Sequence, residues 1–275
     1  MHIKPECITC IMNQTLKVCK LLELDDEASK PLLDSTAQIL INSSMSQTPP
    51  QIAKETYEMI SKLTSNSDPI KSAKELATKI ALDIDVSFAS TLSDFIKLAA
   101  IGNVIDFGAQ KQLDLNTLIK EQFHKEFALN DYEKFAIDLQ NAKSMVYIGD
   151  NTGEHIFDKL LIKKIKELYD IKVYYFTRGK PIINDVTTKE ASHLADITAI
   201  IDTDVPTPGY DLHYANEKSK EIFYSSDIVL AKGMGNYESL YDETTKEIYY
   251  LFIVKCSVVA QAINQNIEEY IFTKH

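Results

Sequence analysis

Side chains with hard oxygen ligands lie in two short, glycine-containing segments of this sequence. Asp150 and Asn151 belong to residues 149–154 (GDNTGE), and Asn184 and Asp185 end residues 178–185 (RGKPIIND). Carboxylate, amide and water oxygens suit Mg²⁺, Mn²⁺ and similar divalent ions, and neither segment has a His or Cys that would favour structural zinc. Few protein ligands leave coordination positions open for water and a substrate oxygen. The alternative is that these residues are ordinary turn and helix-capping residues.

A third segment, residues 232–236 (KGMGN), has groups that suit an anion. The backbone N–H groups of Gly233 and Gly235 can approach an anion closely, beside the ammonium of Lys232. The segment lacks the Walker spacing, so it is not a P-loop. Together with the two oxygen-rich segments, it predicts a phosphate site.

Arg178 is the only arginine among the 29 Lys and Arg residues of the chain. Its planar guanidinium indicates either a bidentate contact at the site or a structural clamp on a loop carboxylate.

The elements that would position these segments are parallel strands. Short apolar runs occur at residues 145–148, 173–176, 197–201 and 228–231, with a fifth within 268–272, and most are followed by a helical pattern. This alternation of strand-like and helix-like segments predicts a Rossmann-like three-layer α/β/α domain with a mainly parallel sheet. Ligands bind outside the carboxyl ends of such strands, so the segments that follow them, including residues 202–204, are expected to converge.

The first hundred residues have a helical pattern without glycine. Gly102 is the first of eight glycines, and apolar residues before it recur at helical spacing. We therefore predict a helical subdomain at residues 1–105 and an α/β domain, with the metal and phosphate sites, at residues 106–275.

Composition narrows the classes of function. A net charge of −11 argues against a nucleic-acid partner. No apolar run is long enough for a membrane span, and the N-terminus lacks the apolar core of a signal peptide, so we expect a cytoplasmic protein without a membrane partner.

Four cysteines are too few for a disulfide scaffold. Cys7 and Cys10 form a C-x-x-C pair whose metal or redox role is left open. Nothing indicates an oligomeric state.

Four ordered motifs resemble the damage-control phosphatase family, long catalogued as domain of unknown function 89. They are residues 102–106 (GNVID) and the three segments at 149–154, 178–185 and 232–236. The opening, residues 5–10 (PECITC), resembles the family's shorter prokaryotic branch. The resemblance covers nearly the whole chain and implies a helical region followed by an α/β domain.

The resemblance also implies an activity. It is that of a phosphatase dependent on one divalent metal ion (Mn²⁺, Mg²⁺, Co²⁺ or Ni²⁺), which hydrolyses sugar phosphates or other small phosphorylated metabolites in metabolite damage control. The metal ligands would be Asp150, Asn151 and Asp185. Lys232, the fourth catalytic residue, would hold the phosphate together with the backbone around Gly233 and Gly235. The substrate or phosphate would meet a further group of residues, some taken from the resemblance and some from their place in the segments: Asn103, Asp106, Glu154, Arg178, Asn184, Gly233, Gly235 and Asn236.

Several alternatives stay open. A metal-oriented water or the Asp150 carboxylate would attack the phosphorus. Glu154 either positions that water or is only a favourable charge at a helix start. An S-adenosylmethionine-dependent methyltransferase could use residues 148–153 as a nucleoside-binding loop, although the G-x-G-x-x-G spacing is missing. A non-catalytic sensor that binds a phosphorylated metabolite is the other alternative.

Overall fold

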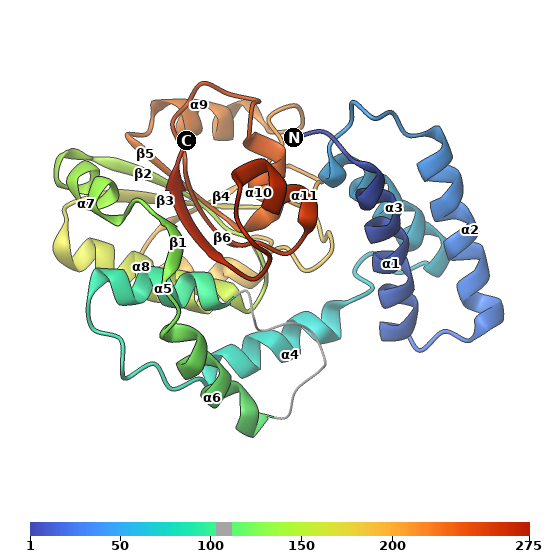
Figure 1. Ribbon diagram of the computed structural model, residues 1–275, viewed down its shortest axis with the longest axis horizontal. Coiled ribbons are helices and arrows are strands. Elements are labelled where there is room, and N and C mark those ends of the chain that lie inside the picture. The colour runs from blue at the N-terminus through green and yellow to red at the C-terminus, as the bar shows by residue number, and fades with distance from the viewer. Residues whose placement is uncertain (103–111) are drawn as a thin grey trace.

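The strands form one sheet whose central members are buried on both faces. In the part of the chain that the structure describes, residues 1–102 and 112–275, the computed structural model has seven strands in the order β1-β7-β6-β5-β2-β3-β4 (Figure 1). Neighbouring strands run parallel, except for the antiparallel pair β6 and β7. The strands are β1 (Phe127–Asn130), β2 (Ser144–Ile148), β3 (Lys172–Thr177), β4 (Ala199–Asp202), β5 (Ile228–Lys232), β6 (Tyr249–Ile253) and β7 (Tyr270–Lys274).

Helices cover both faces of this sheet and form a further group beside it. No helix within residues 1–102 or 112–275 has the length and hydropathy needed to cross a lipid bilayer. The helices are α1 (Pro5–Leu21), α2 (Asp26–Asn42), α3 (Pro49–Thr64), α4 (Lys71–Leu82), α5 (Leu92–Ile101), α6 (Gln112–Phe123), α7 (Tyr132–Asn141), α8 (Glu154–Leu168), α9 (Glu217–Ser225), α10 (Gly233–Leu240) and α11 (Ser257–Ile263), with a short 3-10 helix, η2 (Glu190–Leu194).

Alternate residues of the central strands enter two different hydrophobic cores, as the two-residue period of a strand requires. On β2, Tyr147 lies in the core that includes residues of α5, α6, α7 and α8. Its neighbour Val146 lies in the core that includes residues of α9, α10 and α11. The result is a three-layer α/β/α structure with a mainly parallel sheet, which confirms the predicted fold class.

Two strands were not predicted from the sequence. The first, β6, consists of five consecutive buried residues, YYLFI. Such a continuous apolar run cannot be distinguished from a buried helical segment by periodicity. The second, β1, has four residues and lies at the edge of the sheet. The structure also shows that residues 232–236 are not a loop, because Lys232 ends β5 and Gly233 begins α10.

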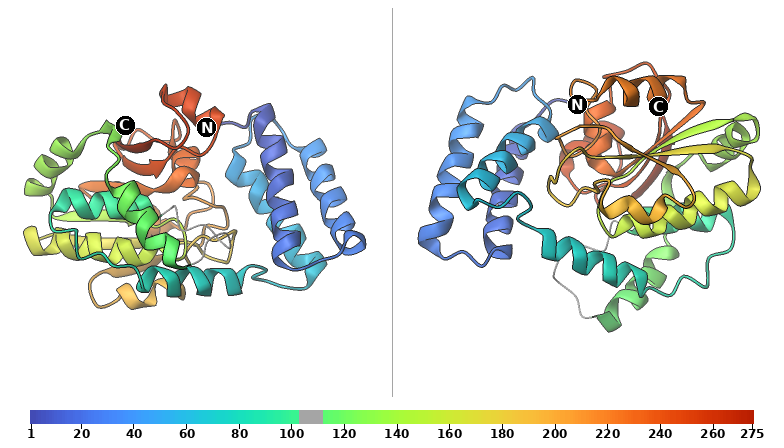
Figure 2. Two further views of the ribbon diagram at one scale, coloured as in Figure 1. Left: turned by 60° about the horizontal axis from the view of Figure 1, so that its bottom comes forward. Right: turned by 180° about the vertical axis from the view of Figure 1, so that it is seen from behind.

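Helices α1, α2 and α3 stand together beside the carboxyl ends of the central strands (Figure 2). Val18, Leu32 and Ile60, one from each helix, pack in a small core of their own. Ile182, which follows β3, also packs in this core and links the group to the sheet. The predicted division at residue 105 stays a prediction, and α5, which precedes it, packs in a core of the sheet.

The start of α8 depends on a buried histidine. The backbone N–H of Gly153 donates a hydrogen bond to Nδ1 of His155 at 2.9 Å. The His155 ring meets the edge of His193, with 4.8 Å between ring centroids. Burial, and then the charge of His193, lower the pKa of His155 from 6.5 to about 4. His155 is therefore neutral in the folded protein at neutral pH.

This lowered pKa predicts a loss of stability in acid. Between pH 6.5 and about 4 the unfolded chain protonates at position 155 and the folded chain does not, so the free energy of unfolding falls as the pH falls. From pH 7.5 to 5.0 the loss from this residue is about 2 kcal/mol. We expect the difference in unfolding free energy between wild type and His155→Asn, measured in urea at both pH values, to shrink by that amount.

The matched control is His124→Asn, which removes an exposed histidine at the end of α6. Its unfolding free energy should follow that of the wild type at both pH values. Parallel behaviour of wild type and His155→Asn would contradict the prediction.

Candidate active site

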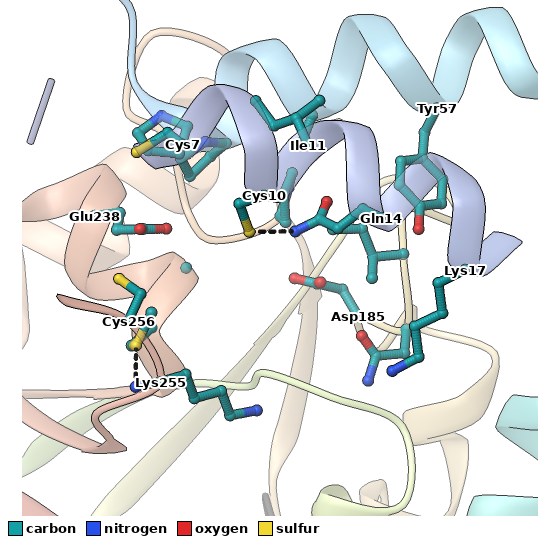
Figure 3. A pocket seen from close by; sticks show the side chains of 18 of the residues that line it. Cys7, Cys10, Ile11, Gln14, Lys17, Tyr57, Asp185, Glu238, Lys255 and Cys256 are labelled. Atoms are coloured by element: carbon teal, nitrogen blue, oxygen red, sulfur yellow. Dashed lines mark hydrogen bonds between the residues drawn. The ribbon is translucent and has the colours of Figure 1, made fainter. Parts of the chain in front are cut away.

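The segments that follow β2, β3 and β5 meet at the carboxyl edge of the sheet, as the sequence predicts for parallel strands. They form one wall of a cavity of about 380 Å³, and α1 and α3 contribute to the facing wall (Figure 3). The sheet-side wall includes the three predicted metal ligands, a neighbouring asparagine and one glycine from the first turn of α10. These residues are Asp150, Asn151, Asp185, Asn184 and Gly235.

Two of these segments are paired through their backbones. Asn151 and Asp185 form an isolated antiparallel bridge. The N–H of Val186 donates to the carbonyl of Asp150 at 2.8 Å, and the N–H of Thr152 donates to the carbonyl of Asn184, also at 2.8 Å. The residues predicted to hold a metal are therefore brought together although 34 positions separate Asn151 from Asp185.

Arg178 joins these segments without lining the cavity. Its side chain is fully buried, and Nε donates to Oδ2 of Asp185 at 2.8 Å. Its Nη2 donates to the carbonyl of Gly149 and to Oδ1 of Asn236, both at 3.1 Å. The sequence left two interpretations of this arginine open. The structure shows the structural clamp on a carboxylate, because Arg178 bonds Asp185 and does not line the cavity.

Lys232, predicted to hold the phosphate, is also buried. Its Nζ donates to Glu154 at 3.1 Å and to Asp158 at 3.0 Å. Burial favours a neutral amine, but the carboxylates of Asp158, Glu154 and Asp150 outweigh it and raise the pKa of Lys232. Lys232 is thus a buried ammonium with carboxylate partners and does not line the cavity.

Gly233 lets the Asp150 carboxylate approach the start of α10. Its φ is +77°, a conformation that favours glycine, and a Cβ there would lie 1.9 Å from Oδ2 of Asp150. A Cβ at Gly235 would meet no atom closer than 3.4 Å. Of the two glycines in KGMGN, only Gly233 is required by this close approach.

The described part of the buried cluster holds more acidic than basic side chains. Within residues 1–102 and 112–275, Asp150, Glu154, Asp158 and Asp185 are its buried carboxylates, and the buried cations Lys232 and Arg178 contact three of them. If all six are ionised, these described groups carry two more negative charges than positive ones. Burial, followed by repulsion from Asp185, raises the pKa of Asp150 to about 7. Burial also raises the pKa of Glu154 to about 7, against the effect of Lys232. A divalent cation would offset this excess.

The donor atoms fit such a cation. Nδ2 of Asn151 donates to Asp150 at 2.8 Å and to Glu154 at 2.7 Å, which leaves its Oδ1 as a ligand. In Asp185, Oδ2 accepts from Arg178 and from the Gly209 N–H, and Oδ1 accepts no hydrogen bond from the described residues. No three His, Cys, Asp or Glu side chains within residues 1–102 and 112–275 are grouped to hold a metal. The set would therefore combine two carboxylates with the Asn151 amide oxygen and water, as Mg²⁺ and Mn²⁺ accept.

The remaining predicted residues have different places. Asn236 is buried and holds the segments together, because its Nδ2 donates to the carbonyls of Gly149 at 3.1 Å and Lys232 at 2.6 Å. Glu154 is buried and fixes the Asn151 amide. Asn103 and Asp106 lie outside the described residues.

Several residues that line the cavity were not predicted from the sequence: Lys17, Tyr57, Glu238 and Lys255 (Figure 3). Tyr57 and Lys17 come from α3 and α1, and no sequence signal indicates that these helices face the sheet edge. Lys255 follows β6, so identifying that strand would have indicated its position. Burial raises the pKa of Glu238 to about 7.

Cys7 and Cys10 line the cavity together with Cys256. Burial raises the pKa of all three thiols, which disfavours the reactive thiolate at neutral pH. A metal or redox role for the C-x-x-C pair stays a prediction.

Comparison with known proteins supports the family resemblance of the sequence motifs. The chain is 34% identical to an uncharacterized protein of Methanocaldococcus jannaschii, over 100% of this chain and 96% of the relative. It is 30% identical to a damage-control phosphatase of Pyrococcus horikoshii, over 96% and 94% of the two chains. A crystal structure of a DUF89 family protein from P. horikoshii superposes with a TM-score of 0.92 at 28% identity, covering 100% and 99%.

The pattern of the damage-control phosphatase ARMT1-like domain matches residues 3–271, which is almost the whole chain. This chain therefore belongs to the damage-control phosphatase ARMT1-like family.

Proposed function

We propose that this protein is a phosphatase that hydrolyses small phosphorylated metabolites, sugar phosphates among them, with the help of one divalent metal ion. The observation that carries the proposal is the buried cluster of four carboxylates and two cations at the cavity. Its excess negative charge and oxygen donors suit a divalent cation, and the cavity beside it has room for a small ester. The phosphatase names of two relatives support the reaction type.

Asp150, Asn151 and Asp185 would hold the ion. When bound, a divalent ion polarises a phosphoryl oxygen and lowers the pKa of a water molecule. The protein's own groups prepare the site for this. Arg178 fixes Asp185 by its hydrogen bond of 2.8 Å, and Glu154 fixes the Asn151 amide by one of 2.7 Å.

The start of α10 would face the phosphate. Gly235 lines the cavity, and Gly233 lies against Asp150. Backbone N–H groups at a helix start have no partner within the helix and favour anions. The phosphate would thus lie between the metal site and α10.

Asp150 would take part in either route of attack, as a metal ligand or as the nucleophile. Its Oδ2 accepts from Asn151 and lies against Gly233. Trapping a phosphorylated Asp150 with a slow substrate would support attack by the carboxylate. Solvent ¹⁸O in the released phosphate, with no phosphorylated Asp150 trapped, would support direct attack by water.

Replacing Asp150 should abolish the metal-dependent activity. Asp150→Asn preserves the shape of the side chain and removes one negative charge from the ligand set. We expect phosphate release from a panel of sugar phosphates, with Mn²⁺ or Mg²⁺, to fall at least about 100-fold. Calorimetric titration with Mn²⁺ should show weakened binding.

Asp202→Asn is the matched control, because Asp202 also ends a strand, is exposed and does not line the cavity. It should behave as the wild type. Release that survives both EDTA and Asp150→Asn would refute the proposal. Phosphate binding without turnover would favour the sensor, and metal-independent binding of S-adenosylmethionine would favour the methyltransferase.

The two glycines of α10 give a second prediction. Gly233→Ala would place a methyl group against the Asp150 carboxylate at a φ of +77°, which by itself costs about 1–2 kcal/mol of stability. We expect it to displace Asp150, lower the melting temperature and weaken Mn²⁺ binding by at least about tenfold. Gly235→Ala, whose Cβ has ordinary contacts, should leave Mn²⁺ binding nearly unchanged. Equal effects of the two variants would show that the close approach at Gly233 is unimportant.

A further inference from the structure

Hydrolysis of a sugar phosphate needs a proton for the departing alcohol as well as an attacking group. The oxygen of such an ester leaves as a strongly basic alkoxide unless an acid protonates it. We infer that Glu238 of α10 is this general acid and donates its proton to the departing oxygen of the substrate. The inference rests on the proposed phosphatase function and assigns a further catalytic residue to the same site.

Helix α10 carries Glu238 on the face that meets the cavity. Gly235 and Glu238 lie three positions apart on this helix, so they share one of its faces. Both line the cavity. Since the phosphate would lie at the start of α10, the next turn of the helix brings the Glu238 carboxyl beside the rest of the substrate.

The carboxyl of Glu238 reaches the cavity from a different side than the metal site. In Figure 3, the Glu238 side chain points into the space below α1, toward Cys10, whereas Asp185 faces this space from the other side. In phosphoryl transfer the attacking and departing oxygens lie roughly in line, on opposite sides of the phosphorus. An attacking group held near Asp150 and Asp185 would therefore leave the departing oxygen on the side of Glu238.

Four carboxyl side chains of the described residues line the cavity: Glu6, Asp150, Asp185 and Glu238. Asp150 and Asp185 would be metal ligands, and Glu6 is exposed to solvent. Glu238 is partly buried, and its carboxyl forms no hydrogen bond or ion pair with the residues that the structure describes. Its proton is therefore available to a substrate.

The surroundings of Glu238 favour the protonated form that an acid requires. Burial raises the pKa of Glu238 to about 7; the ammonium of Met1 opposes this effect, and the charge of Asp150 adds to it. A general acid is most effective when its pKa lies near the working pH. The cysteine thiols of the cavity are less suited, because burial raises their pKa values and they release a proton less readily.

Glu238 would give up one proton and recover one in each turnover. When the bond between the phosphorus and the ester oxygen breaks, this oxygen keeps the electron pair and takes the proton of Glu238 to form the alcohol. Water supplies the oxygen that replaces it on the phosphorus, either directly or by way of Asp150. One proton of this water stays on the phosphate, and the other restores the Glu238 carboxyl.

The test compares three variants with the wild type, each loaded with Mn²⁺. Glu238→Gln keeps the shape of the side chain without an acidic proton, Glu238→Asp keeps a carboxyl, and Glu221→Gln changes an exposed glutamate of α9 outside the cavity. The substrates are p-nitrophenyl phosphate, whose nitrophenolate leaves without a proton, and benzyl phosphate, whose alkoxide is strongly basic. The ratio of kcat/KM for the two esters does not depend on how much of a variant is folded.

We expect Glu238→Gln to lower kcat/KM about 100-fold or more for benzyl phosphate and less than about fivefold for p-nitrophenyl phosphate. Glu238→Asp should recover part of this loss, and Glu221→Gln should match the wild type. Equal losses on the two esters would overturn the inference and leave the proposed function standing. A wild type that hydrolyses only p-nitrophenyl phosphate would also overturn the inference alone. A wild type that hydrolyses neither ester would overturn both.

Discussion

The arrangement of the site depends on one buried guanidinium. Arg178 contacts the Asp185 carboxylate, the carbonyl of Gly149 and the side chain of Asn236, which belong to three segments far apart in the sequence. A buried charge is tolerated only with such partners, since removing one partner of a buried pair leaves an uncompensated charge. The three segments are therefore mutually dependent, because each satisfies a group that would otherwise destabilise the fold.

The buried lysine beside it shows that residue type alone does not define a role. Lys232 and its two carboxylates form part of the interior, together with the hydroxyls of Tyr147 and Tyr175 on Asp158. The cluster thereby neutralises part of its own charge and retains an excess that suits a metal. Lys255, by contrast, lines the cavity and is exposed.

Sequence reasoning predicted the features that depend on local periodicity and strand ends. It placed four of the five parallel central strands, the convergence of Asp150, Asn151 and Asp185, and the α/β/α layers. It missed β6, because a wholly buried strand has no alternation, and with β6 it missed Lys255. It could not distinguish a buried Lys232 from an exposed one, since burial depends on Asp158, one helical turn beyond Glu154 on α8. The facing wall from α1 and α3 depends on tertiary packing, which no motif records.

The cavity joins two distant parts of the chain. Tyr57, Gln14 and Lys17 come from the first 64 residues, whereas the carboxylates that suit a metal follow residue 149. Under the proposed function, reaction chemistry and substrate choice would be encoded in separate stretches of the gene. Substitutions in α1 and α3 would then change which ester is bound without disturbing the hydrogen bonds around Arg178.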